Sequence, residues 1–236
     1  MGLDIYVGSF TRYYSGNWET VVQKYGSEQS LGVQVVRLNS PVDAITDPNQ
    51  IQPTILSWRD KLSQSLGSNI DSPLDWDETD TAPYFTDKPA WDCYSSLLLW
   101  AAYSEHPELP RPHDCIEDWT SDIAFQRSID PNFKSSFPQL LRDVEIWLPQ
   151  KFAFTFRAAD PTGKELGFGS SIFLQTQLEL LNHRTWNATD QTLALWLNEG
   201  AEYKAPLEIG ARFAFSIMYE LAHQAVKHRL VMKLDY

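Results

Sequence analysis

The sequence has few cysteines and no long apolar segment. The first feature argues against a disulfide-rich protein and the second against a membrane-spanning one. Cys93 and Cys115 are the only cysteines among 236 residues. Cys93 lies in an apolar run, where a thiol usually behaves as a small hydrophobic side chain, so a disulfide framework is not indicated. The longest apolar run, residues 97–102, is far shorter than the roughly 18 residues that suggest a membrane helix. We therefore expect no membrane-spanning segment.

Basic residues are also scarce. The chain has 19 Lys and Arg against 31 Asp and Glu, which gives a formal charge of −12. Such a charge disfavours general attraction to nucleic acid or anionic lipid, so we expect neither as a partner, and a basic protein would suit the chain better. The opening MGLDIYVG lacks the basic and then apolar pattern of a secretory signal. We expect a cytoplasmic protein.

Familiar catalytic motifs are missing as well. No serine lies in a Gly-x-Ser-x-Gly elbow, and neither cysteine has the sequence surroundings of an activated thiolate. The glycines at 163, 167 and 169 match neither a P-loop nor the full dinucleotide fingerprint. The sequence therefore names no catalytic residue and predicts no cofactor.

The apolar content is sufficient for a large core. Hydrophobic residues make up 43% of the chain and aromatic residues 13%, and we expect residues 1–236 to form a single globular domain. Alternating patterns predict strands at 3–7, 33–38 and 230–234. Helical spacing and capping residues predict helices at 18–25, 53–66, 90–104, 121–127, 138–147, 170–183, from 189 onward and at 206–228. Together they predict an α+β fold, with a small mixed or antiparallel sheet covered by several helices.

One hairpin is predicted between residues 151 and 168. The sequence Asp160-Pro161-Thr162-Gly163 has the residue types that a type I turn prefers. Before it, aromatic rings at positions 152, 154 and 156 alternate with smaller or polar residues, as in a half-buried strand.

An acidic stretch at residues 71–92 is the most conspicuous polar feature. It contains seven acidic residues, one basic residue and three prolines, which predicts an exposed loop. Aromatic side chains interleave with the carboxylates, and aromatic anchors among charges suit recognition of a basic protein surface. The predicted partner-binding residues are Asp75, Trp76, Asp77, Glu78, Asp80, Tyr84 and Trp91.

Two other interpretations remain open. Closely spaced carboxylates at 75–80 could share a divalent cation, as in a metal-dependent hydrolase. An EF-hand starting at Asp75 is excluded, because Asp80 replaces the required glycine and Thr86 the bidentate glutamate. Alternatively, an enzyme pocket could be assembled from aromatic and polar residues that are far apart in sequence, which no motif would reveal.

The opening MGLDIYVG, followed by TRYY and Trp18, resembles the start of a group of uncharacterised bacterial proteins. The resemblance implies a bacterial cytoplasmic origin and no particular activity. We therefore expect a cytoplasmic interaction or regulatory protein, of an immunity-like kind, that binds a basic partner through its acidic aromatic surface. The metal-dependent hydrolase is the alternative.

Overall fold

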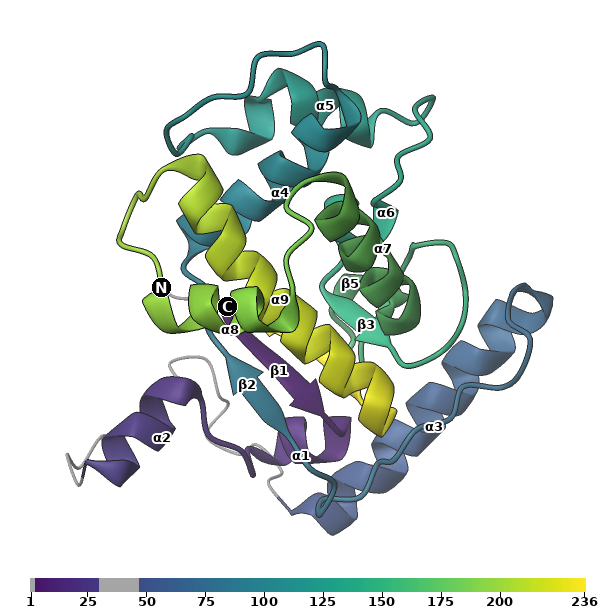
Figure 1. The fold of residues 1–236 in the computed structure, drawn as a ribbon. Helices are drawn as coiled ribbons and strands as arrows, with labels where there is room; N and C mark the ends of the chain where they lie inside the picture. Colours follow the sequence, from purple (N-terminus) through teal and green to yellow (C-terminus); the bar gives the residue numbers. More distant parts are fainter. Residues whose placement is uncertain (1–2, 30–46) are drawn as a thin grey trace.

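The computed structural model describes residues 3–29 and 47–236 and confirms the α+β class (Figure 1). The elements in this part of the chain are β1 (Asp4–Gly8), α1 (Phe10–Ser15), α2 (Val21–Glu28), α3 (Pro48–Leu66), η1 (Gly67–Asn69), β2 (Phe85–Asp87), α4 (Trp91–Glu105), η2 (Trp119–Ser121), α5 (Ile123–Ile129), α6 (Pro138–Leu141), β3 (Ile146–Leu148), β4 (Phe156–Ala159), β5 (Glu165–Ser170), α7 (Ser171–Arg184), α8 (Asp190–Glu199), α9 (Leu207–His228) and β6 (Val231–Asp235). The strand predicted at 33–38 lies outside the described residues.

The strands form one mixed sheet of six, which is larger than the sequence suggested. Its order is β2-β1-β6-β3-β5-β4. β3 and β5 run parallel, and all other neighbouring pairs are antiparallel. The C-terminal strand β6 therefore lies in the interior of the sheet, between β1 and β3, where its side chains are covered by neighbours.

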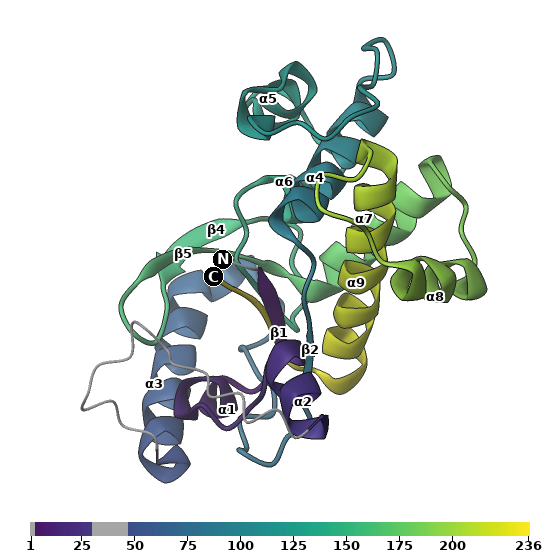
Figure 2. The ribbon, with the colours of Figure 1, turned by 90° about the vertical axis from the view of Figure 1, so that its left-hand side faces the viewer.

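Helices cover both faces of this sheet, as Figure 2 shows. The larger layer contains α4, α7 and α9, and its core includes alternate residues of β1 and β6 such as Ile5, Val7 and Met232. The thinner layer contains α1 and α3, and its core includes Phe10 and Ile55 together with strand residues such as Ile146, Phe168 and Val231. In the described residues, no helix has both the length and the apolarity needed to span a membrane.

Two local predictions were wrong in extent. The helix predicted at 138–147 ends at Leu141, and Ile146–Leu148 is strand β3. Asp143 adopts a left-handed φ of 48°, which is incompatible with a continuing helix. The apolar run at 146–148 is buried on both faces, and periodicity alone cannot distinguish helix from strand in so short a run. In the hairpin, β4 begins only at Phe156.

The predicted turn itself is confirmed. The Gly163 backbone N–H donates to the Asp160 carbonyl at 2.9 Å, and the Asp160 N–H donates to the Lys164 carbonyl at 2.8 Å. Gly163 has a φ of 90°, a left-handed conformation that glycine adopts without a steric penalty. Residues 160–164 connect β4 to β5, and the turn holds Asp160 between the two strands.

Candidate functional site

The predicted acidic surface is not uniformly exposed. Trp76 and Glu78 are buried, with 3% and 4% of their surface exposed. The Glu78 carboxylate accepts hydrogen bonds from the backbone N–H groups of Phe10 and Thr11 at 3.3 and 2.8 Å, from the Thr11 hydroxyl at 3.0 Å and from the Trp76 indole. Burial raises the pKa of Glu78, and these donors oppose that effect. Glu78 therefore anchors the start of α1 and faces away from solvent.

The neighbouring carboxylates lie nearer to solvent. Asp75 is exposed and lies 3.7 Å from an Arg59 nitrogen and 3.4 Å from an Arg229 nitrogen, so its charge is partly compensated within the chain. Asp77 is exposed and accepts the backbone N–H of Thr79 at 2.8 Å. Asp80 is half-buried. Asp75 and Asp77 therefore contribute the exposed negative charge of the predicted surface.

The two remaining aromatic residues of the predicted surface lie in different surroundings. Tyr84 is half-buried, and the charged groups of Arg12 and Lys24 lie 4.9 and 5.0 Å from its ring centre. Trp91 is 37% exposed at the start of α4, and its ring centre lies 5.1 Å from that of Tyr236. Binding of a basic partner to this stretch stays a prediction.

In the part of the chain that the structure describes, no set of metal ligands supports the metal-dependent hydrolase alternative. Across residues 3–29 and 47–236, no three His, Cys, Asp or Glu side chains are grouped so that they could hold a metal ion. The burial of Glu78 against α1 removes one of the four carboxylates on which that interpretation depended.

A different polar pocket lies beside β6, and we call it the lysine pocket. Its volume is about 180 Å³. It is lined by Tyr13, Tyr14, Glu145, Asp160, Thr162, Lys164, Lys233, Leu234, Asp235 and Tyr236. These residues come from α1, the turn between β4 and β5, the segment before β3, and the C-terminal strand with the residue that follows it.

Lys233 is the unusual residue of this pocket. It is 8% exposed, and in the register of the sheet it lies opposite Tyr6 of β1 and Ile146 of β3. Its Nζ lies 5.3 Å from the Tyr13 ring centre and makes no hydrogen bond or ion pair with any described residue. Burial lowers the pKa of Lys233, while the nearby carboxylates of Asp235, Asp160 and Glu145 oppose the shift.

Three tyrosine hydroxyls each donate to one of those carboxylates. Tyr13 donates to Asp235 at 2.5 Å and Tyr14 to Asp160 at 2.9 Å. The third pair, in which Tyr236 donates to Glu145, is 2.5 Å long. Burial together with the adjacent carboxylate raises the pKa of Tyr14 and of Tyr236. Hydrogen bonds to ionised acceptors are short and strong, so these pairs fix the carboxylates around the lysine.

Local sequence explains why two tyrosines can face this pocket. Ser9 caps α1 by accepting the backbone N–H of Arg12 at 3.1 Å, and Gly16 ends the helix in a left-handed conformation with φ 74°. Tyr13 and Tyr14 are consecutive in its last turn and point in directions about 100° apart, because a helix has 3.6 residues per turn. One short helix can therefore reach two carboxylates on different elements.

Asp160 serves as a wall of the pocket. It is buried, and its Oδ1 accepts the backbone N–H groups of Thr162 and Lys164 at 2.9 and 3.0 Å and the Thr162 hydroxyl at 2.6 Å. Its Oδ2 accepts the Tyr14 hydroxyl. Because both oxygens are engaged, Asp160 holds the turn and Tyr14 in place.

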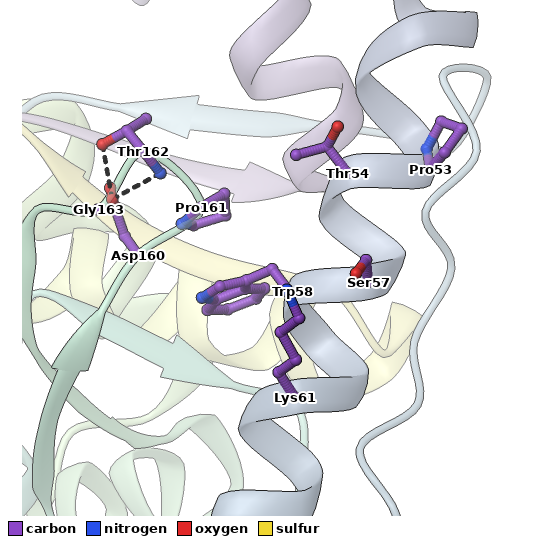
Figure 3. Close-up of a pocket in the computed structure, with 9 residues that line it drawn as sticks. All are labelled: Pro53, Thr54, Ser57, Trp58, Lys61, Asp160, Pro161, Thr162 and Gly163. Carbon is purple, nitrogen blue, oxygen red and sulfur yellow. Dashed lines mark hydrogen bonds between the residues drawn. The ribbon is translucent and has the colours of Figure 1, made fainter.

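An open groove of about 610 Å³ lies between α3 and the same turn (Figure 3). It is lined by Pro53, Thr54, Ser57, Trp58, Lys61, Asp160, Pro161, Thr162 and Gly163, and we call it the Trp58 groove. Asp160 and Thr162 line both hollows, so the two lie next to each other.

No sequence signal marks Lys233 as a site residue. In the run VMKLD it occupies an ordinary alternating position of a strand. The Lys233 side chain is buried because β6 pairs with β1 on one side and β3 on the other. Asp160 was recognised as a turn residue, but its contact with Tyr14 spans 146 positions of sequence. No protein-family model, curated protein or solved structure matches this chain.

Proposed function

We propose that this protein binds a small polar molecule in the lysine pocket and that Lys233 is the principal donor to it. The observation that carries this proposal is the Lys233 side chain, which is 8% exposed, lines the pocket and forms no hydrogen bond with a described residue. An ammonium has three N–H donors. A ligand with acceptor oxygens would bind to them in the pocket.

The charges of the lining restrict the ligand. Three carboxylates, at Glu145, Asp160 and Asp235, face two ammonium groups, at Lys164 and Lys233, which leaves a formal charge of −1. A free anion is therefore disfavoured, and an uncharged group rich in oxygen acceptors fits better. The hydroxyls of Tyr14 and Tyr236, which donate to carboxylates, can still accept a hydrogen bond from ligand O–H or N–H groups.

The size of the pocket agrees with a small ligand. A volume of 180 Å³ equals that of about six water molecules in the liquid. This is below the several hundred Å³ of most drug-sized sites, so the pocket would hold one compact group and not a large cofactor.

The experiment is a binding screen with matched variants. Calorimetry and thermal shift against uncharged polyols, sugars and amides should identify a ligand for the wild type that raises the unfolding midpoint. Lys233→Met should abolish the effect, and Lys164→Met, which changes an exposed lysine of the same lining, should retain most of it. Equal binding by the wild type and Lys233→Met would refute the proposal.

A second candidate function is recognition of a basic cytoplasmic protein. The observation that favours it is a separate groove of about 350 Å³ in which Trp91 is 37% and Tyr203 is 80% exposed. Exposed aromatic residues in a groove are typical anchors of protein interfaces. Asp75 and Asp77 do not line this groove and would add negative charge elsewhere on the predicted surface. A pull-down from a bacterial lysate should lose its partner with Trp91→Ala and Asp75→Asn/Asp77→Asn, and binding unaffected by these changes would refute this function.

A further inference from the structure

The Trp58 groove has an aromatic platform that the protein holds in a fixed orientation. The indole N–H of Trp58 donates to the Ala159 carbonyl at 2.8 Å. Its ring packs against Phe10, Trp76 and Phe168, with ring centres 5.4, 6.5 and 6.1 Å away. The side chain is half-buried, and it projects from α3 toward the turn that starts at Asp160 (Figure 3). An apolar surface is therefore presented to the groove without the need for any rearrangement.

Uncommitted polar groups surround this platform. Thr54, Ser57 and Lys61 are exposed on α3, and their side chains form no hydrogen bond with another residue in the described ranges. On the facing turn, the Thr162 hydroxyl donates to Asp160 and can still accept a hydrogen bond. Both oxygens of the Asp160 carboxylate already accept hydrogen bonds from the protein, so the groove has donors and acceptors but no unengaged acidic group in its lining.

A flat aromatic face bordered by hydroxyls suits a sugar ring. One face of many pyranoses is made of C–H groups, which pack on an aromatic ring, while the hydroxyls around the edge both donate and accept hydrogen bonds. The neighbouring lysine pocket adds Lys233 as a donor and the hydroxyl oxygens of Tyr14 and Tyr236 as acceptors, and its negative formal charge disfavours acidic ligands. Both hollows thus favour the same uncharged, hydroxyl-rich chemistry.

We propose that the ligand is a neutral oligosaccharide, with one sugar unit in the lysine pocket and the adjoining unit on Trp58, across the turn formed by residues 160–163. This inference rests on the proposed function of the lysine pocket, and it adds the ligand class and a second subsite. The shared lining of the two hollows by Asp160 and Thr162 is the observation that connects the subsites.

The test begins with an array of neutral and acidic oligosaccharides probed with the full-length protein. A neutral oligosaccharide should be retained and acidic ones should not. Its affinity, measured by calorimetry, should fall about tenfold or more in Trp58→Ala, because the stacked unit loses its platform. Binding of the corresponding monosaccharide, held in the lysine pocket alone, should be unchanged.

Because Trp58 also packs on the core, Thr54→Arg serves as a second variant. Thr54 is exposed, so a larger side chain there fills the groove and leaves the core intact. Leu195→Ala on α8 is the control, since that side chain is 53% exposed and lines neither hollow. If a small molecule binds through Lys233 while Trp58→Ala and Thr54→Arg have no effect, the oligosaccharide proposal fails and the lysine pocket stands. If groove variants weaken binding but Lys233→Met does not, the proposed function fails. An array without any neutral glycan bound overturns the inference.

Discussion

Replacing Lys233 with methionine should make the folded protein more stable while it removes ligand binding. Methionine is unbranched like lysine and one atom shorter, is apolar and flexible, and would lie against the same neighbours, Tyr13, Tyr6 and Ile146. The change removes the charge of a side chain that is only 8% exposed and that forms no hydrogen bond with a described residue. A gain in stability from loss of a polar group is the behaviour expected of a residue retained for binding.

The magnitude follows from two opposing contributions. Replacement of buried charged groups by apolar ones of similar volume is often neutral or stabilising by about 1–4 kcal/mol. Here the carboxylates of Asp235, Asp160 and Glu145 lose a favourable nearby charge, which reduces the gain. We therefore expect a gain of about 1–2 kcal/mol in the free energy of unfolding, and for a chain of this size each kcal/mol raises Tm by about 2–4 °C.

The pH dependence gives the same prediction an internal check. Burial lowers the pKa of Lys233 below its ordinary value of 10.5, so the unfolded chain holds this proton more strongly than the folded protein. The wild type should therefore gain stability relative to Lys233→Met as the pH rises from the folded pKa toward 10.5. Comparing the two proteins cancels the titration of the tyrosines.

Urea unfolding followed by tryptophan fluorescence measures both effects, and an unchanged m-value would show that the same surface is exposed in both proteins. A loss of more than about 2 kcal/mol in Lys233→Met would refute the reasoning, since breaking a buried ion pair costs about 3–5 kcal/mol and would identify Lys233 as a structural partner.

Three further changes test the framework of the site. Glu78→Ala should lower the free energy of unfolding by about 2–4 kcal/mol, because several buried donors at the start of α1 lose their acceptor. Chemical denaturation measures this loss. Glu78→Gln keeps one acceptor oxygen and should lower the free energy of unfolding by less. Tyr14→Phe should cost about 1 kcal/mol through loss of the hydrogen bond to Asp160, and an unchanged unfolding midpoint would show that the pair contributes nothing. Gly167→Ala should destabilise by about 2 kcal/mol or more, since its Cβ would lie 1.8 Å from the Asp143 carbonyl oxygen; a circular dichroism melt equal to the wild type would contradict this.

The long helices could be predicted because their signals are local. α4 is apolar around its whole circumference and is buried at the centre of the larger layer, and α9 begins directly after Pro206. The turn at Asp160 and strand β6 were predicted for the same reason, since preferred turn residues and strict alternation do not depend on distant partners.

The site could not be predicted because its contacts join distant segments. Tyr13 and Asp235 are separated by 222 positions, and Glu145 and Tyr236 by 91. The acidic stretch at residues 71–92 is conspicuous by its composition, yet successive side chains alternate between the interior and solvent. Trp76 and Glu78 are buried, and their neighbours are exposed. Composition can locate charge, but which charges face solvent is decided by packing against α1 and α3.

A crystal structure of the protein at high resolution, grown with the ligand identified in the screen, tests the central claim most directly. We predict an acceptor oxygen of the ligand about 2.7–3.2 Å from Lys233 Nζ, with the three tyrosine–carboxylate pairs intact. A direct ion pair between Lys233 and Asp235 or Asp160, with the ligand bound elsewhere, would contradict it.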